Sequence, residues 1–352
     1  MSQRVEGLEG IRGLAAFWVF THHFILIFYP VFYFGQHTWL NHILNPDLAV
    51  TWFFVHSGYV LAYKGSHLEG KEYYKNLLGQ IIRRYFRLLP VVLFSILLTL
   101  LFFKLNFIHN RTYGIMVNSS WLSRYLNFSP DFFEAIKQSF FGVYFNFKSA
   151  TTYNPNLWTI GYELISSYLL FVILGILGPH KKLAPVFIVL AFLIGPWKGM
   201  MSFLFGALLT RLPKHKAHPF LIGFFTLAGF YLSDLKGVYE SHARSIGATC
   251  IMYALIQAPN IRAFLKVRFF QFLGNISYSL YATHFLLLAS LSSFLGIYWQ
   301  AHLNISKVLL VYLITTVTLF ILSYLTWKFI DKPGIGLAKK IAAKFITVED
   351  LT

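Results

Sequence analysis

Cysteine and charged residues are both scarce in this sequence. Of 352 residues only Cys250 is a cysteine, which excludes an internal disulfide bond. Charged residues make up 12% of the chain, whereas about 25% is typical of soluble domains. The hydrophobic fraction is 57%, and apolar runs recur along nearly the whole length. These proportions exclude a soluble globular protein and indicate one that crosses a lipid bilayer several times.

The signals of several other architectures are missing as well. The alternation of apolar and polar residues that marks an outer-membrane barrel is absent, so we expect helices to satisfy the backbone within the lipid. There is no low-complexity linker, sequence repeat or soluble-domain block. We therefore predict a single all-α domain over residues 1–352, a polytopic membrane helical bundle. The first apolar segment lacks a signal-peptide cleavage site and is expected to remain a helix.

Positive charge greatly exceeds negative charge. The chain has 30 Lys and Arg residues against 13 Asp and Glu, a formal net charge of +17. The basic residues gather in alternate connecting segments such as 64–87 and 262–268, whereas 35–46 and 298–305 contain none. This pattern is typical of cytoplasmic loops, so it predicts both termini in the cytoplasm and no nucleic-acid partner. The ten predicted transmembrane helices are 10–34, 47–63, 88–106, 157–178, 184–197, 199–212, 219–235, 243–258, 270–297 and 306–330.

One further apolar segment, residues 132–147, is amphipathic because it contains Glu134 and Lys137. Counting it as an eleventh span would place the later basic loops outside. We interpret it instead as an interfacial or re-entrant helix within a long outer loop, residues 107–156.

Ionisable residues within the predicted spans are few, and they are functional candidates because a charge inside the bilayer is costly. Arg12 begins the first span. Eleven steps of about 100° bring His23 within roughly 20° of the face of Arg12, with a rise of roughly 16 Å, which suggests mid-membrane depth. His22 points elsewhere and is expected to serve helix packing. The other ionisable candidates within spans are His56, Glu163 and His284.

Glu163 lies five residues beyond Trp158, which fits an outer aromatic belt, so these groups are expected to line one polar cavity open to the outside. A metal site is not expected, because His-Glu-x-x-His and cysteine pairs are missing. The Gly-x-Ser-x-Gly elbow of serine hydrolases is missing too. An alternative is a transporter or flippase in which His and Glu relay protons. The lack of an inverted repeat with broken helices speaks against that alternative.

The segment "QIIRRYFRLLP" (80–90) carries three arginines just before the third span. Arg83 and Arg87 are four residues apart and share a helix face. Guanidinium groups bind phosphate through two parallel hydrogen bonds, so this face is a candidate phosphate site together with Arg84. Simple orientation by positive charge is the alternative. The glycines of "GLEGIRG" (7–13) do not form a dinucleotide fingerprint, and we expect them to let the first helix pack closely against the basic segment.

Six short motifs follow one another along the chain. They are "LEGIRGLAAFWVFTHH" with Arg12 and His23, "FFVHSGYVLA" (53–62) with His56 and Ser57, "RRYFRLLP" with Arg83, Arg84 and Arg87, "NLWTIGYEL" with Trp158 and Glu163, "FLGNISYSLYATHF" (272–285) with Ser277, Tyr278, Tyr281 and His284, and "FIDKPGI" (329–335).

Taken in order, these motifs resemble those of the integral-membrane acyltransferase-3 family over essentially the whole chain. Three positions depart from its pattern: Thr51 stands where many members carry an acid, His56 where leucine is usual, and Asp331 where glutamate is more usual. The resemblance implies O-acylation, most often O-acetylation, of envelope glycans. It also implies a multi-pass protein of the bacterial inner membrane, a cytoplasmic acyl-CoA donor such as acetyl-CoA, and a glycan acceptor on the outer side. The sequence does not indicate an oligomeric state.

The resemblance also suggests roles. His23 is the expected general base, because an imidazole with a pKa of about 6.5 accepts protons near neutrality. Glu163 is expected to orient His23 or bind the acceptor, and the arginines of the basic segment to hold the donor phosphates. Expected oxyanion donors are Tyr278, Tyr281 or His284. A covalent acyl-histidine intermediate is an alternative. The remaining acceptor-site candidates are Trp158, His56 and Ser57.

Overall fold

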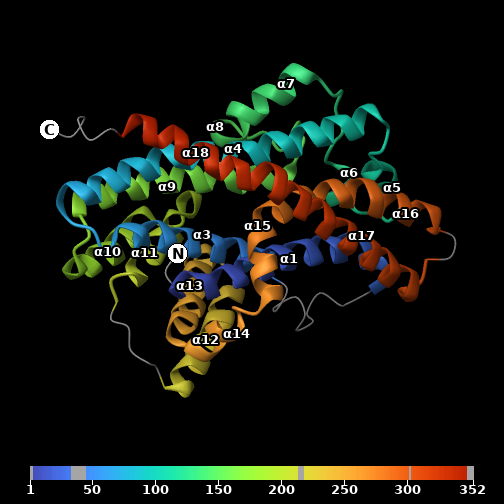
Figure 1. Ribbon diagram of the computed structural model, residues 1–352. Coiled ribbons are helices and arrows are strands. Elements are labelled where there is room, and N and C mark those ends of the chain that lie inside the picture. The colour runs from blue at the N-terminus through green and yellow to red at the C-terminus, as the bar shows by residue number, and fades with distance from the viewer. Residues whose placement is uncertain (1–2, 33–44, 213–217, 301–302, 347–352) are drawn as a thin grey trace.

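The computed structural model describes residues 3–32, 45–212, 218–300 and 303–346, and all regular structure in these ranges is helical (Figure 1). Each of the ten predicted spans coincides with a helix or a continuous helical run. Residues 33 and 34 of the first span and most of the outer loop 35–46 lie outside the described residues. The all-helical prediction is confirmed for the described part of the chain.

Five helical runs are long and apolar enough to cross a membrane. They are Gly7–Phe28 within α1 (Gln3–Phe32), α4 (Gly70–Lys104), Pro155–Leu177 with α9 (Trp158–Leu177), Arg268–Tyr298 with α15 (Arg268–Leu287) and α16 (Ser293–Tyr298), and Ile305–Phe345 with α17 (Ile305–Thr326) and α18 (Lys332–Phe345). Shorter helices fill the bundle between them: α3 (Pro46–Gly65), α10 (Ala184–Ile194), α11 (Met200–Leu209), α12 (Pro219–Asp234) and α13 (Glu240–Gln257). These lengths indicate a multi-pass membrane protein, and the count of ten spans stays a prediction.

The amphipathic segment forms one short helical run of three parts: α7 (Phe132–Lys137), η1 (Gln138–Gly142) and α8 (Val143–Phe145). Its length is roughly 21 Å at 1.5 Å per residue, shorter than a hydrocarbon core of about 30 Å. It packs on α4 and α9 and exposes phenylalanines such as Phe133 and Phe141 (Figure 1). These features fit the interfacial or re-entrant interpretation.

Helix α1 packs along α15 at very close range, and this contact positions the site described below. A Cβ atom added at Gly13 would lie 2.3 Å from the carbonyl carbon of Leu273, and one at Gly274 would lie 2.5 Å from the Glu9 carbonyl oxygen. Glycine is required at both positions because any side chain would separate the helices. The expectation that the N-terminal glycines pack against segment 80–90 is therefore wrong: their partners lie on the chain leading into α15 and on α15 itself.

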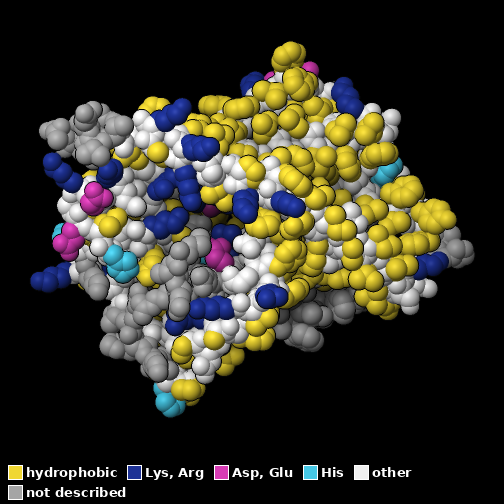
Figure 2. Space-filling view, in the orientation of Figure 1, with side chains coloured by type: hydrophobic (Ala, Val, Ile, Leu, Met, Phe, Trp, Pro, Cys, Tyr) yellow, Lys and Arg dark blue, Asp and Glu magenta, His cyan; other side chains and the backbone are white. Residues whose placement is uncertain are grey.

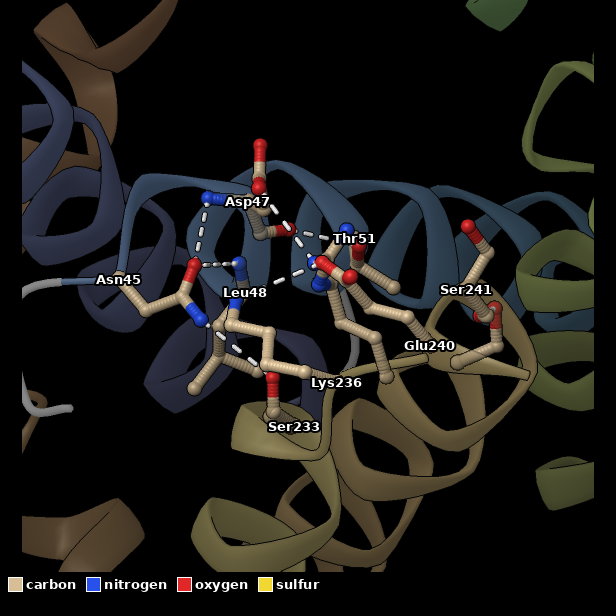
Figure 3. Close-up of polar contacts among 10 residues, drawn as sticks. Asn45, Asp47, Leu48, Thr51, Ser233, Lys236, Glu240 and Ser241 are labelled. Carbon is tan, nitrogen blue, oxygen red and sulfur yellow. Dashed lines mark hydrogen bonds and ion pairs between the residues drawn. The ribbon is translucent and has the colours of Figure 1, made fainter. Parts of the chain in front are cut away.

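The beginning of α3 is tied to α12 and α13 by polar contacts (Figure 3). The Asn45 side chain accepts hydrogen bonds from the first backbone amides of α3, and its amide donates to the Ser233 carbonyl at 3.3 Å. Arg244 pairs with Glu240 on its own helix and with Asp47 on α3 at 3.4 Å. These paired charges hold the beginning of α3 against α13.

Candidate active site

The two histidines predicted at mid-depth on α1 and α15 meet. His23 Nδ1 lies 3.0 Å from His284 Nε2, and the two rings meet with centroids 5.3 Å apart and planes inclined by 24°. His284 is fully buried, whereas His23 is partly exposed. The Trp121 ring packs on the His23 ring with centroids 4.9 Å apart. The pair therefore has one fully enclosed member and one that is partly exposed.

Arg12, like His23, contacts α15, but it does so nearer the N-terminal end of that helix. Its Nε donates to Ser277 Oγ at 2.8 Å and a terminal nitrogen donates to the Gly274 carbonyl at 3.0 Å. Glu9 on α1 pairs with the guanidinium at 3.0 Å. Since Arg12 and His23 both reach α15, they share the helix face that their eleven-residue spacing predicts.

Glu163 on α9 is bound by groups from two other helices. Its Oε1 accepts a hydrogen bond from Arg84 of α4 at 2.6 Å and another from Ser57 of α3 at 3.2 Å. Arg84 also donates to Ser167 Oγ at 2.9 Å. The described contacts of Glu163 thus join three helices, and the partner found for His23 is His284 rather than this carboxylate.

Arg87 pairs with Asp331, at the junction between α17 and α18. Asp331 is 2% exposed, so the guanidinium supplies the countercharge that a buried carboxylate requires. Arg87 also lies over the Tyr278 ring at 5.4 Å, and the Tyr278 hydroxyl donates to the Leu88 carbonyl at 2.8 Å. Arg87 therefore links α4, α15 and the C-terminal run of helices.

Arg83 differs from the other two arginines of the basic segment. Its Nε donates to the Gly79 carbonyl of its own helix at 2.8 Å, and no acid among the described residues pairs with it. Figure 2 shows Lys and Arg side chains gathered on the half of the molecule that carries both termini, while hydrophobic side chains cover most of the other half. Arg83 is consequently the arginine of this segment best placed to accept an external anion.

A family model described as an acyltransferase domain matches residues 5–328. The chain belongs to the acyltransferase-3 family. The search of curated proteins and the search of solved structures each give no match. Family membership makes this chain a membrane O-acyltransferase that carries an acyl group from a donor to an acceptor hydroxyl.

Three predicted site residues of this acyltransferase remain to be placed: Tyr281, His56 and Trp158. The Tyr281 hydroxyl donates to the Asn156 carbonyl at 2.9 Å and accepts from Thr159. His56 is 2% exposed and stacks on Trp52 with ring centroids 5.2 Å apart. Trp158 is 38% exposed and packs against Tyr162 with ring centroids 5.3 Å apart.

Sequence reasoning missed two neighbours of the histidine pair. Asn156 donates its side-chain amide toward His284 Nε2 at 2.9 Å, and Trp121 packs on His23. Asn156 is the first residue of the "NLWTIGYEL" motif, whose predicted site residues are only Trp158 and Glu163. Within the part of the chain that is described, no cluster of three His, Cys, Asp or Glu residues has the arrangement of a metal site.

Proposed function

We propose that this acyltransferase moves an acetyl group from cytoplasmic acetyl-CoA to a hydroxyl of an envelope or surface polysaccharide or oligosaccharide. The proposal includes ten spans in the bacterial inner membrane. The observation that carries it is the contact between the partly exposed His23 and the buried His284. An imidazole that is held at one nitrogen and has no described hydrogen bond at the other is suited to take the proton of an attacking hydroxyl.

In the proposed reaction the acceptor hydroxyl oxygen attacks the thioester carbonyl carbon while His23 takes the hydroxyl proton. The tetrahedral intermediate then collapses, the carbon–sulfur bond breaks, and the protonated imidazole returns the proton to the leaving thiolate. The products are an ester and free CoA. Tyr278 and Tyr281 remain candidates to stabilise the oxyanion, but both hydroxyls now donate to backbone carbonyls and would have to exchange partners.

The donor phosphates are proposed to bind at the basic half of the molecule, with Arg83 as the principal contact. Arg84 and Arg87 are already paired with acids and would contribute weaker, shared contacts. We place Glu163 at this donor end, where it orients Arg84 and holds Ser57, instead of beside the base. Arg12 lies roughly 16 Å below His23 along α1, a span that the extended pantetheine arm of CoA can follow.

The experiment that tests this function uses the purified full chain in lipid nanodiscs, labelled acetyl-CoA, and a glycan fraction from cells that lack the protein. We expect label in the glycan, with a mass increase of one acetyl group, and free CoA released only when the glycan is present. Movement of glycan across liposomes without consumption of acetyl-CoA would instead support a transporter or flippase.

A further inference from the structure

The hydrogen position on His284 follows from its surroundings. Its Nδ1 lies 3.3 Å from the Leu280 carbonyl oxygen, which can only accept, so Nδ1 carries a hydrogen. His284 is fully buried, and a second proton would place a charge in an apolar environment at high cost. The ring is therefore neutral, and its Nε2 is bare.

Two groups face this bare nitrogen, and as donors they share its single lone pair. One is the side-chain amide of Asn156 at 2.9 Å, and the other is His23 Nδ1 at 3.0 Å. The backbone of Asn156 is held at both polar atoms. Its backbone N–H donates to the Asn154 side-chain oxygen, and its backbone carbonyl accepts from the Tyr281 hydroxyl. Because an acceptor nitrogen faces His23 Nδ1, that atom carries the single hydrogen of the neutral ring.

We propose that His284 and Asn156 are positioning residues that hold His23 in the tautomer with a bare Nε2. The tautomer itself follows from contacts alone, and its use as a proton acceptor rests on the proposed function. Without this anchor the ring could carry its hydrogen on either nitrogen, and the tautomer with hydrogen on Nε2 cannot accept a proton there.

The hydrogen bond from His23 to His284 would also stabilise His23 once its ring is protonated. When His23 Nε2 takes the hydroxyl proton, Nδ1 still donates to His284 Nε2, and the hydrogen bond becomes charge-assisted and stronger. A carboxylate orients the base in serine hydrolases. Here a neutral imidazole takes that place, and it avoids burying a permanent negative charge within the bilayer.

The decisive variant is Asn156→Asp, which keeps the shape of the side chain and reverses its hydrogen-bonding polarity. A carboxylate only accepts, so it draws a proton from solvent onto His284 Nε2. Because the Leu280 carbonyl keeps the other hydrogen on Nδ1, His284 becomes an imidazolium whose charge the introduced carboxylate balances. His23 Nδ1 then becomes the acceptor, and the hydrogen of His23 moves to Nε2. The readout is the ¹⁵N chemical shift of both ring nitrogens in histidine-labelled full-length protein in nanodiscs, assigned with His23→Gln.

We expect hydrogen on His23 Nδ1 in the wild type and on Nε2 in Asn156→Asp. Acetyl transfer from acetyl-CoA to the glycan fraction should fall in this variant by on the order of 10²-fold, as when a general base is lost. Its pH profile should also change. His284→Gln should preserve the wild-type tautomer and most of the transfer, because the amide oxygen can accept both hydrogen bonds, whereas His284→Leu should not.

The matched control is Asn154→Asp. It adds the same carboxylate two residues away and removes the 2.6 Å hydrogen bond to the Ala282 carbonyl, without contacting His284. Its thermal stability shows what the loss of one buried hydrogen bond costs, and the His23 tautomer should stay that of the wild type.

Hydrogen on Nε2 in the wild type would overturn the inference, and so would a wild-type His23 tautomer and pH profile in Asn156→Asp at a pH where the ¹⁵N shifts show hydrogen on both nitrogens of His284. Failure of the proposed function looks different, because the wild-type tautomer would then be as described while His23→Ala still transferred acetyl groups.

Discussion

Two polar clusters lie along the same helices and are built in different ways. The cluster nearer the N-terminus of α1 consists of paired charges, whereas the second, which we predict to lie at mid-depth, is held by hydrogen bonds between uncharged or titratable side chains. The first comprises the pairs Arg12–Glu9, Arg84–Glu163 and Arg87–Asp331, and the second comprises His23, His284 and Asn156.

The difference follows from the cost of charge in lipid. A permanent charge is costly in lipid unless a countercharge accompanies it, and here Arg12, Arg84 and Arg87 are each paired with an acid. Deeper groups must stay neutral until the moment of reaction. A neutral imidazole is also the form that can accept a proton, so one physical constraint favours both the stability and the chemistry of the mid-depth cluster.

The largest expected effect comes from breaking the neutral cluster. His23→Ala should lower acyl transfer by about 10²- to 10⁴-fold, the usual contribution of a general base. Expression and membrane insertion should be unchanged because the side chain is partly exposed. The measurement is transfer in membranes at matched protein levels over a range of pH. Wild-type transfer should decline as the pH falls and the imidazole becomes protonated.

His22→Ala is the control for this change. His22 is the neighbouring histidine on α1, and the facing argument assigns it to packing. The variant should keep measurable activity, with any loss accompanied by lower stability. An inactive His22→Ala beside a normal His23→Ala would mean that the reactive cavity lies on the other side of α1.

Breaking the charged cluster should act on stability first. Asp331→Asn leaves Arg87 without its buried partner and should lower the free energy of unfolding by about 3 kcal/mol, the low end for a buried pair, because Arg87 is partly exposed. Thermal unfolding in detergent measures the change. Glu134→Gln breaks the exposed pair with Lys137 and should cost less than about 1 kcal/mol. Equal losses in the two variants would show that the Arg87 pair is not the stronger of the two.

Much of the fold could be predicted because apolar length and helical period are local properties of the sequence. The helices coincide with the predicted spans, and the common face of Arg12 and His23 follows from eleven residues of helical rotation. The segment at 132–147 was also recognisable, since Glu134 and Lys137 made it amphipathic.

The partners across helices could not be predicted in the same way. Nothing in the spacing of Arg83, Arg84 and Arg87 tells which of them meets an acid, because the acids come from α9 and from the end of α17. The N-terminal glycines showed that a close approach would occur but not that α15 would be the neighbour. Such pairings depend on the packing order of the bundle, which one sequence does not encode locally.

A smaller effect should separate Arg83 from its two paired neighbours. Arg83→Gln should weaken the binding of acetyl-CoA about tenfold or more, since a hydrogen bond to a charged group contributes about 1.5–3 kcal/mol. Stability should stay close to that of the wild type, because no described acid depends on Arg83. Lys104→Gln, an exposed change at the other end of α4, is the control and should leave donor affinity unchanged. Unchanged affinity in Arg83→Gln would reduce this residue to an orientation signal.

The smallest expected effect comes from single cysteine substitutions that should leave activity intact. Their labelling shows which side of the membrane each end of the bundle faces. In a Cys250→Ser background, Ser149→Cys adds an exposed thiol beyond α8 and Glu69→Cys adds one before α4. An impermeant maleimide should label position 149 in intact cells and position 69 only after permeabilisation. That result would place the charged cluster and the predicted donor site on the cytoplasmic side. Labelling in the opposite order would overturn the ten-span topology, and with it the assignment of a cytoplasmic donor.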